Sequence, residues 1–455
     1  AGDPAASSLA QNSPVLRDRR AVTSFLVAHG YDTAAELQGA WWTNGPNLVT
    51  LDEATERTYA AVDDSVLEYG DAFTFHLPGQ YMSDQEGEAT LLFQTDGMED
   101  PLTLRLSGLD LVSVHSFNPV VVPYIVDPED GSDPEPAPNY DMDDMLEETR
   151  DWLPIANDNP VERESVFVPL SEISEAEDAE AYVLGLAASL YNEEGEEDEF
   201  YHAVLFDGVN DFPCGGGIAY VGWQVGVSCV EVDPETGSLD EGGDIVAHEF
   251  GHNFHLWHTP CGLSSYDPDY PYPNAQMGPE PGWSYPLDRF ITNADGYVSY
   301  MSYCEPPFVS DFDYREAAEW FLHLTGEWGA EDAQPRADER PGQLYRSIAL
   351  MGRLDVESGE WELLQSQYST RPPRRPREGP WELVLFDRIG VELYREPMRL
   401  YERQRRDEHE EPRQVLTWFA RVPVPPQVPA ELRIIDPDGI EAFSSAIEVT
   451  PSKQR

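Results

Sequence analysis

The stretch HEFGHNFHLWH (residues 248–258) contains four of the chain's ten histidines. On a helix, His248 and His252 would stand one turn apart on one face, so both imidazoles could reach a single metal ion. Glu249 would point toward the same ion. A catalytic zinc takes three protein ligands and keeps its fourth position for water. The spacing therefore predicts a zinc helix with Glu249 as the candidate general base.

His258 is the expected third ligand. To reach the ion from there, the helix must stop near His255 and the chain must fold back. His255 is a possible competitor, but three ligands from one continuous helix cannot easily surround a tetrahedral ion. The expected metal ligands are therefore His248, His252 and His258, and the expected cofactor is one catalytic Zn²⁺.

The histidine string, followed downstream by SYMSYC (residues 299–304), resembles the metzincin metallopeptidases. The resemblance implies that Met301 forms a hydrophobic floor beneath the zinc ligands. It also implies a place near zinc for Tyr303, which matches a tyrosine of astacin-like and serralysin-like members. Where the family has glycine for a turn with positive φ, this chain has His255, and histidine enters that region less easily. We expect a strained or slightly displaced turn there.

The metzincin resemblance implies an α+β catalytic domain, with a mixed sheet and a zinc helix, that hydrolyses proteins or glycoproteins. Zinc would activate water, Glu249 would carry the proton, and Tyr303 could stabilise the oxyanion. The arrangement along the chain is similar to bacterial secreted StcE-like metzincins. Two alternatives stay open: a non-catalytic adhesion or carbohydrate-binding protein with a relic zinc domain, and a zinc hydrolase acting on something other than protein. The intact Glu249 argues against the first.

The net charge of −58, from 86 acidic and 28 basic residues, is far from the usual range. It argues against nucleic acid and anionic membranes as partners, because both would be repelled. Lys453 is the only lysine, and an acid excess with almost no lysine indicates adaptation to high salt. Acidic runs such as EEGEEDE (residues 193–199) lack the ligand spacing of calcium loops, so Ca²⁺ is possible but unsupported.

The four cysteines are an even number and all lie in the expected catalytic region. They favour secretion with two disulfides. Of the three possible pairings we prefer Cys214 with Cys229 and Cys261 with Cys304. The start AGDPAASSLAQNSP is typical of a flexible segment left after removal of a leader, and no apolar run is long enough to cross a membrane. We expect an extracellular or cell-surface monomer.

The length of 455 residues and the sequence pattern predict about three domains. Short strand-like runs predict a β-sandwich-like domain over residues 1–115, alternating strands and helices predict the zinc domain over residues 116–330, and further strand-like runs predict a second sandwich over residues 331–455. The metzincin resemblance also implies an edge strand before the zinc helix that holds an extended substrate. IAYVGWQV (residues 218–225) occupies that place, although an interior strand is the alternative.

Overall fold

The computed structural model is α+β, with one large mixed sheet and several antiparallel, sandwich-like sheets. The residues that it describes are 15–16, 21–25, 35–44, 47–50, 73–77, 86–95, 102–112, 116–131, 133–155, 158–175, 179–209, 212–233, 236–261, 266–279, 282–284, 287, 289–328, 347–369, 373, 379–406 and 415–449. Residues 1–14, for which a flexible start is predicted, lie outside this set.

The chain divides into two compact units, each built from several stretches of sequence. The first contains residues 1–117, 150–159 and 259–327, and the second contains residues 118–149, 160–258 and 328–455. The zinc-helix segment and the C-terminal strands therefore belong to the same unit. The division into three domains at residues 115 and 330 stays a prediction.

The N-terminal strands of the first unit form a sheet in the order β1-β7-β6-β3-β4 and a separate β2-β5 pair. All pairings are antiparallel except that of β1 with β7. This agrees with the all-β pattern of the sequence. The strands are β1 (Val15–Leu16), β2 (Ala21–Phe25), β3 (Ala35–Asn44), β4 (Asn47–Thr50), β5 (Phe73–Leu77), β6 (Glu86–Thr95) and β7 (Leu102–Val112).

The rest of the first unit consists of short elements and one long helix. These elements are η4 (Pro273–Ala275), β15 (Gly282–Ser284), β16 (Arg289–Ile291), η5 (Asn293–Asp295), β17 (Val298–Ser299), β18 (Pro307–Phe308) and α7 (Asp311–Trp328). The long helix α7 contains the run REAAEWFLHL (residues 315–324). No helix among the described residues is long and apolar enough to cross a membrane.

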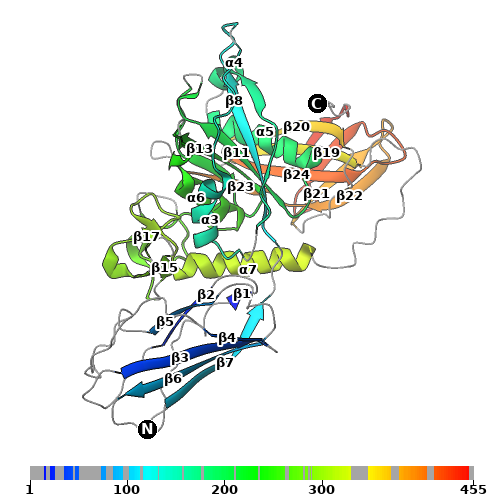
Figure 1. Cartoon of the computed structure of the whole chain (residues 1–455). Coiled ribbons are helices and arrows are strands. Elements are labelled where there is room, and N and C mark those ends of the chain that lie inside the picture. The colour runs from blue at the N-terminus through cyan, green and yellow to red at the C-terminus, as the bar shows by residue number, and fades with distance from the viewer. Residues whose placement is uncertain are drawn as a thin grey trace. The chain divides into compact units, whose positions relative to one another are not determined.

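The second unit begins with alternating strands and helices, as the sequence predicts for this region (Figure 1). They are β8 (Asn118–Asp127), α2 (Met142–Met145), α3 (Glu147–Trp152), β9 (Val161–Glu162), β10 (Val166–Pro169), α4 (Leu170–Glu175), α5 (Ala179–Glu194), β11 (Glu199–Phe206), β12 (Gly217–Tyr220), β13 (Val225–Val232), β14 (Leu239–Glu241) and α6 (Gly243–Asn253). α3 crosses the boundary of the two units.

β11 lies inside the large sheet and is buried on both faces, since successive side chains of a strand point to opposite sides and all its residues after Glu199 are buried. In β11, Tyr201 and Leu205 join the core that contains the apolar residues of α5. Phe200 of the same strand stacks on Phe254 at 5.4 Å between ring centroids, just beyond α6. α5 and α6 therefore cover opposite faces of the sheet, and β11 contributes side chains to both faces.

The sheet continues without a break into the C-terminal strands, in the order β10-β8-β11-β13-β12-β23-β24-β19-β20. The C-terminal members are β23 (Tyr401–Arg406), β24 (Val415–Pro423), β19 (Ser347–Asp355) and β20 (Glu360–Ser369). β12 pairs antiparallel with β13 on one side and with β23 on the other. The expectation of an edge strand is therefore wrong, and the alternative of an interior strand is correct. The run IAYVGWQV also bends, because residues 221–224 form a turn between β12 and β13.

The C-terminal strands form two layers around a common core, which includes Leu350, Trp418, Leu383 and Ile434. One layer belongs to the large sheet, and the other is the antiparallel sheet β22-β21-β25-β26. The strands are β19 (Ser347–Asp355), β20 (Glu360–Ser369), β21 (Trp381–Phe386), β22 (Glu392–Met398), β23 (Tyr401–Arg406), β24 (Val415–Pro423), β25 (Glu431–Ile435) and β26 (Glu441–Ala446).

Candidate metal centre

α6 carries the first two histidines and is held firmly at both ends. At its start, Gly242 has φ +113°, and a Cβ there would lie 2.9 Å from Val230 Cγ1, so only glycine fits. At its end, the Asn253 side-chain amide donates to the carbonyls of Trp223 (2.7 Å) and Val225 (3.1 Å). These contacts fix the helix against the β12–β13 turn and thereby fix the direction of its histidines.

His248 and His252 lie one turn apart on α6, and both side chains are fully buried. Their ring centroids are 4.8 Å apart and the rings stand almost perpendicular. Buried polar rings need partners, because an unsatisfied polar group inside a protein is costly. The two rings lie on one face of the helix, as the sequence pattern predicts, and His258 supplies a polar partner to each.

The chain folds back directly after α6, as the histidine spacing requires. The helix ends at Asn253, and the Leu256 N–H donates to the Gly251 carbonyl at 3.0 Å. Between them, His255 adopts φ +73°, the left-handed conformation for which the metzincin resemblance implies a glycine. A histidine thus occupies the positive-φ turn position, and the turn brings His258 back to the helix.

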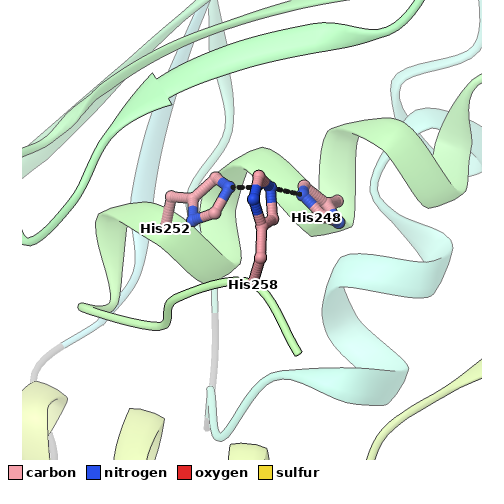
Figure 2. Close-up of side chains that lie close together, drawn as sticks. All are labelled: His248, His252 and His258. Atoms are coloured by element: carbon pink, nitrogen blue, oxygen red, sulfur yellow. Dashed lines mark hydrogen bonds between the residues drawn. The ribbon is translucent and has the colours of Figure 1, made fainter. Parts of the chain in front are cut away.

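The three histidines His248, His252 and His258 form one buried group that could hold a metal ion (Figure 2). His258 Nε2 lies 3.2 Å from Nε2 of His252 and 3.2 Å from Nε2 of His248. Ligands about 2.05 Å from a tetrahedral ion are separated by about 3.3 Å, so these spacings fit a zinc-sized site. His255 is not part of this group.

The orientation of His252 is fixed by the turn that follows the helix. Its Nδ1–H donates to the Leu256 carbonyl at 2.8 Å, so Nε2 carries the lone pair that a metal ion needs. Burial lowers the pKa of His252 to about 4, which keeps the imidazole neutral. A neutral ring with Nε2 directed at the other two histidines is suited to bind a divalent cation near neutral pH.

Glu249 follows His248 on α6 and is fully buried. Its side chain contacts Gly217 at the start of β12, where a Cβ would come 2.6 Å from Glu249 Oε1 and 2.8 Å from the Val227 carbonyl oxygen. Because no larger residue fits at this position, the strand can approach the carboxylate closely. The sequence pattern did not reveal this contact, since Gly217 is distant from α6 along the chain.

Both predicted disulfides are present. Cys214 pairs with Cys229 and Cys261 pairs with Cys304, and the described residues contain no free cysteine. Asp207 lies close to Cys214 and Cys229. The sulfur atoms of these two cysteines are already bonded to each other, so the cluster does not resemble a metal site.

Met301 and Tyr303 belong to the first unit, whereas the three histidines belong to the second. Met301 is fully buried, and its carbonyl accepts a hydrogen bond from the N–H of Thr259, the residue that follows His258 in the chain. The Tyr303 N–H donates to the Cys261 carbonyl. The segment after His258 is thus joined to the methionine turn by backbone hydrogen bonds and by a disulfide.

A buried carboxyl group supports the methionine turn. Asp313 of α7 accepts hydrogen bonds of 2.6 Å from the hydroxyls of Ser299 and Ser310, and Ser299 Oγ in turn accepts the Met301 N–H at 3.1 Å. Burial raises the pKa of Asp313 to about 6. Sequence reasoning missed this residue, because a single aspartate in an acidic chain carries no distinguishing signal.

No protein-family model matches the sequence, and no curated protein is significantly similar to it. The candidate metal centre therefore rests on its own geometry, which is that of three buried imidazoles that could hold a metal ion.

Proposed function

We propose that the protein is a secreted zinc-dependent endopeptidase of the metzincin type that hydrolyses proteins or glycoproteins. The observation that carries the proposal is the buried group His248, His252 and His258, with Nε2 spacings of 3.2 Å and Glu249 on the same helix. The left-handed turn at His255 supports the resemblance, since the proposed family needs positive φ there.

Zinc, when bound by three neutral imidazoles, supplies a Lewis acid and lowers the pKa of its water to about 7. Glu249 then accepts the proton of the attacking water and returns it to the leaving nitrogen of the peptide. Its burial excludes bulk water from this transfer. The roles that the resemblance implies for Met301, as the floor of the site, and for Tyr303, as a donor to the oxyanion, stay predictions.

Secretion is part of the proposal because the chain carries two disulfides, which form in oxidising compartments. The net charge of −58 supports a saline environment, and it disfavours nucleic acids and anionic membranes as partners.

A second candidate is a zinc hydrolase whose substrate is not a protein. One observation favours it: β12, the strand that contacts Glu249, is already paired on both edges, so the edge that would accept a peptide is covered by β23. The two candidates share the metal centre and differ only in substrate.

Glu249→Ala tests the proposed function. The variant should keep its metal ion, since Glu249 is not among the three ligands, while digestion of casein or mucin should fall by about 10²- to 10⁴-fold. Glu231→Ala, at an exposed position of β13, is the matched control and should digest at the wild-type rate. Digestion by Glu249→Ala at the wild-type rate would refute the metallopeptidase mechanism. A metal-loaded wild type that digests neither substrate would favour the non-protein hydrolase or the adhesion alternative.

A further inference from the structure

The outer edge of β12 is covered by a strand from a distant part of the same unit. β23 pairs antiparallel with β12, with Gly217 opposite Arg406 and Tyr220 opposite Arg403. One position further, the Val221 N–H donates to the Glu402 carbonyl at 2.9 Å. β23 was not predicted from the sequence, because YERQRR shows no apolar alternation.

The covered edge is next to the candidate catalytic group. Gly217 is the residue of β12 that touches Glu249, and Arg406 is its register partner on β23. An extended peptide that adds to a sheet edge uses the free backbone N–H and C=O groups of the edge strand. On β12 those groups face β23. A peptide substrate and β23 would therefore compete for the same strand.

β23 is attached strongly at one end and weakly at the other. Tyr401 is buried and contacts the rings of Trp223 and Phe419, and residues 401–402 also pair with β24. From residue 403 onward, the pairings described for β23 are all with β12. A strand end whose described pairings are four register pairs with β12 can separate without unfolding the sandwich, because its anchor at Tyr401 stays in place.

β23 is a basic segment, and the strength of its attachment should therefore depend on ionic strength. Three of its residues, Arg403, Arg405 and Arg406, are basic in a chain whose net charge is −58. At low ionic strength a basic segment is attracted to a chain of opposite net charge, and salt weakens such an attraction.

We propose that β23 is an internal cover strand that occupies the peptide-binding edge of β12 in the free protein and is displaced by an extended polypeptide substrate. The inference rests on the proposed function and specifies how access to that site is regulated. Apparent affinity for a peptide is reduced by the fraction of molecules in which the edge is closed, so loosening β23 increases binding.

Two proline substitutions separate pairing from other effects. Hydrogen-bonded positions alternate along an antiparallel ladder, and the bond from Val221 to Glu402 places residues 404 and 406 in such positions. Gln404→Pro removes an N–H that faces β12, whereas the N–H lost in Arg405→Pro faces away from β12. Arg405→Pro is therefore the matched control for proline itself.

The test measures binding of fluorescein-labelled, carboxymethylated casein to metal-loaded protein in the Glu249→Ala background, where cleavage does not interfere. We expect Gln404→Pro to bind about fivefold or more tightly than its parent, and Arg405→Pro to bind like the parent. Equal affinity of the parent and both proline variants, with metal content and melting temperature preserved, would overturn the proposal.

A second measurement needs no proline. Backbone hydrogen exchange of residues 403–406 in the Glu249→Ala parent should accelerate when casein is added, because this part of β23 leaves β12. Unchanged exchange at saturating casein would also overturn the proposal.

The proposed peptidase function and the proposed cover strand can be refuted independently of each other. Tighter binding by Gln404→Pro without any cleavage by wild type would refute the peptidase function and keep the cover strand. Cleavage by wild type with identical binding in all variants would refute the cover strand and keep the peptidase function.

Discussion

Glu249 lies directly against Gly217, and a Cβ atom at Gly217 would approach Glu249 Oε1 to 2.6 Å. The contact joins the candidate general base to β12, the strand whose outer edge is covered by β23. A carboxylate in a buried site acts on water only in a defined position, and small displacements reduce proton transfer strongly. The glycine is therefore part of what positions the base.

Gly217→Ala should displace the Glu249 carboxylate without removing any metal ligand. We expect peptidase activity to fall by about ten- to a hundredfold while metal content stays near that of wild type. Gly215→Ala is the control, since a Cβ at Gly215 meets nothing within 4 Å. Equal activity of the two variants would show that the contact with Gly217 does not position Glu249.

His258→Ala should abolish stoichiometric zinc binding, whereas His255→Gly should retain about one equivalent. Only His258 lies with its Nε2 near those of His248 and His252. Glycine suits the positive φ of 73° at position 255, so this substitution removes the imidazole without straining the turn. Metal analysis after dialysis decides the point, and similar loss from both variants would contradict the ligand set.

Asp313→Asn should change the pH dependence of stability between about pH 4 and pH 6. The folded-state pKa of Asp313 is raised by burial to about 6, so the folded protein keeps a proton there that the unfolded chain releases near pH 4. Rising pH therefore costs the wild type stability in this window. The variant has no titrating group at this position, so its stability should not decrease with pH for this reason.

Urea unfolding of both proteins at constant ionic strength measures this effect. The free energy of unfolding of wild type relative to Asp313→Asn should fall by up to about 3 kcal/mol from pH 4 to pH 7. A difference that stays constant, or that increases with pH, would show that the buried carboxyl group is already ionised at pH 4.

NaCl should raise the melting temperature. A net charge of −58 on one folded chain produces strong self-repulsion, and the Debye length falls from about 8 Å at 0.15 M to about 3 Å at 1 M salt. NaCl is the appropriate salt because strongly excluded salts such as sulfate stabilise any protein. A melting temperature that is lower in 1 M than in 0.15 M NaCl would argue against adaptation to high salt.

Much of the metal centre followed from spacing along the chain. Histidines at positions 248 and 252 share a helix face for any regular helix, and a third ligand at position 258 required the helix to end and reverse, as it does at His255. The disulfide pairing was one of three possibilities, and the structure has the preferred one. These features are local or contain few alternatives, so sequence reasoning can reach them.

The neighbours of β12 were decided only by the tertiary structure. The two partners, β12 and β23, are far apart in the sequence, and pairing depends on how the C-terminal layers pack against the sheet rather than on the residues of either strand. The same holds for Gly217 against Glu249 and for Asp313 beneath the Met301 turn. The sequence alone determined which residues could bind a metal ion, because ligand type and helical period are properties of the chain itself. The pairing of β12 with β23, which we propose limits the access of a peptide to that site, is a long-range contact that no local pattern encodes.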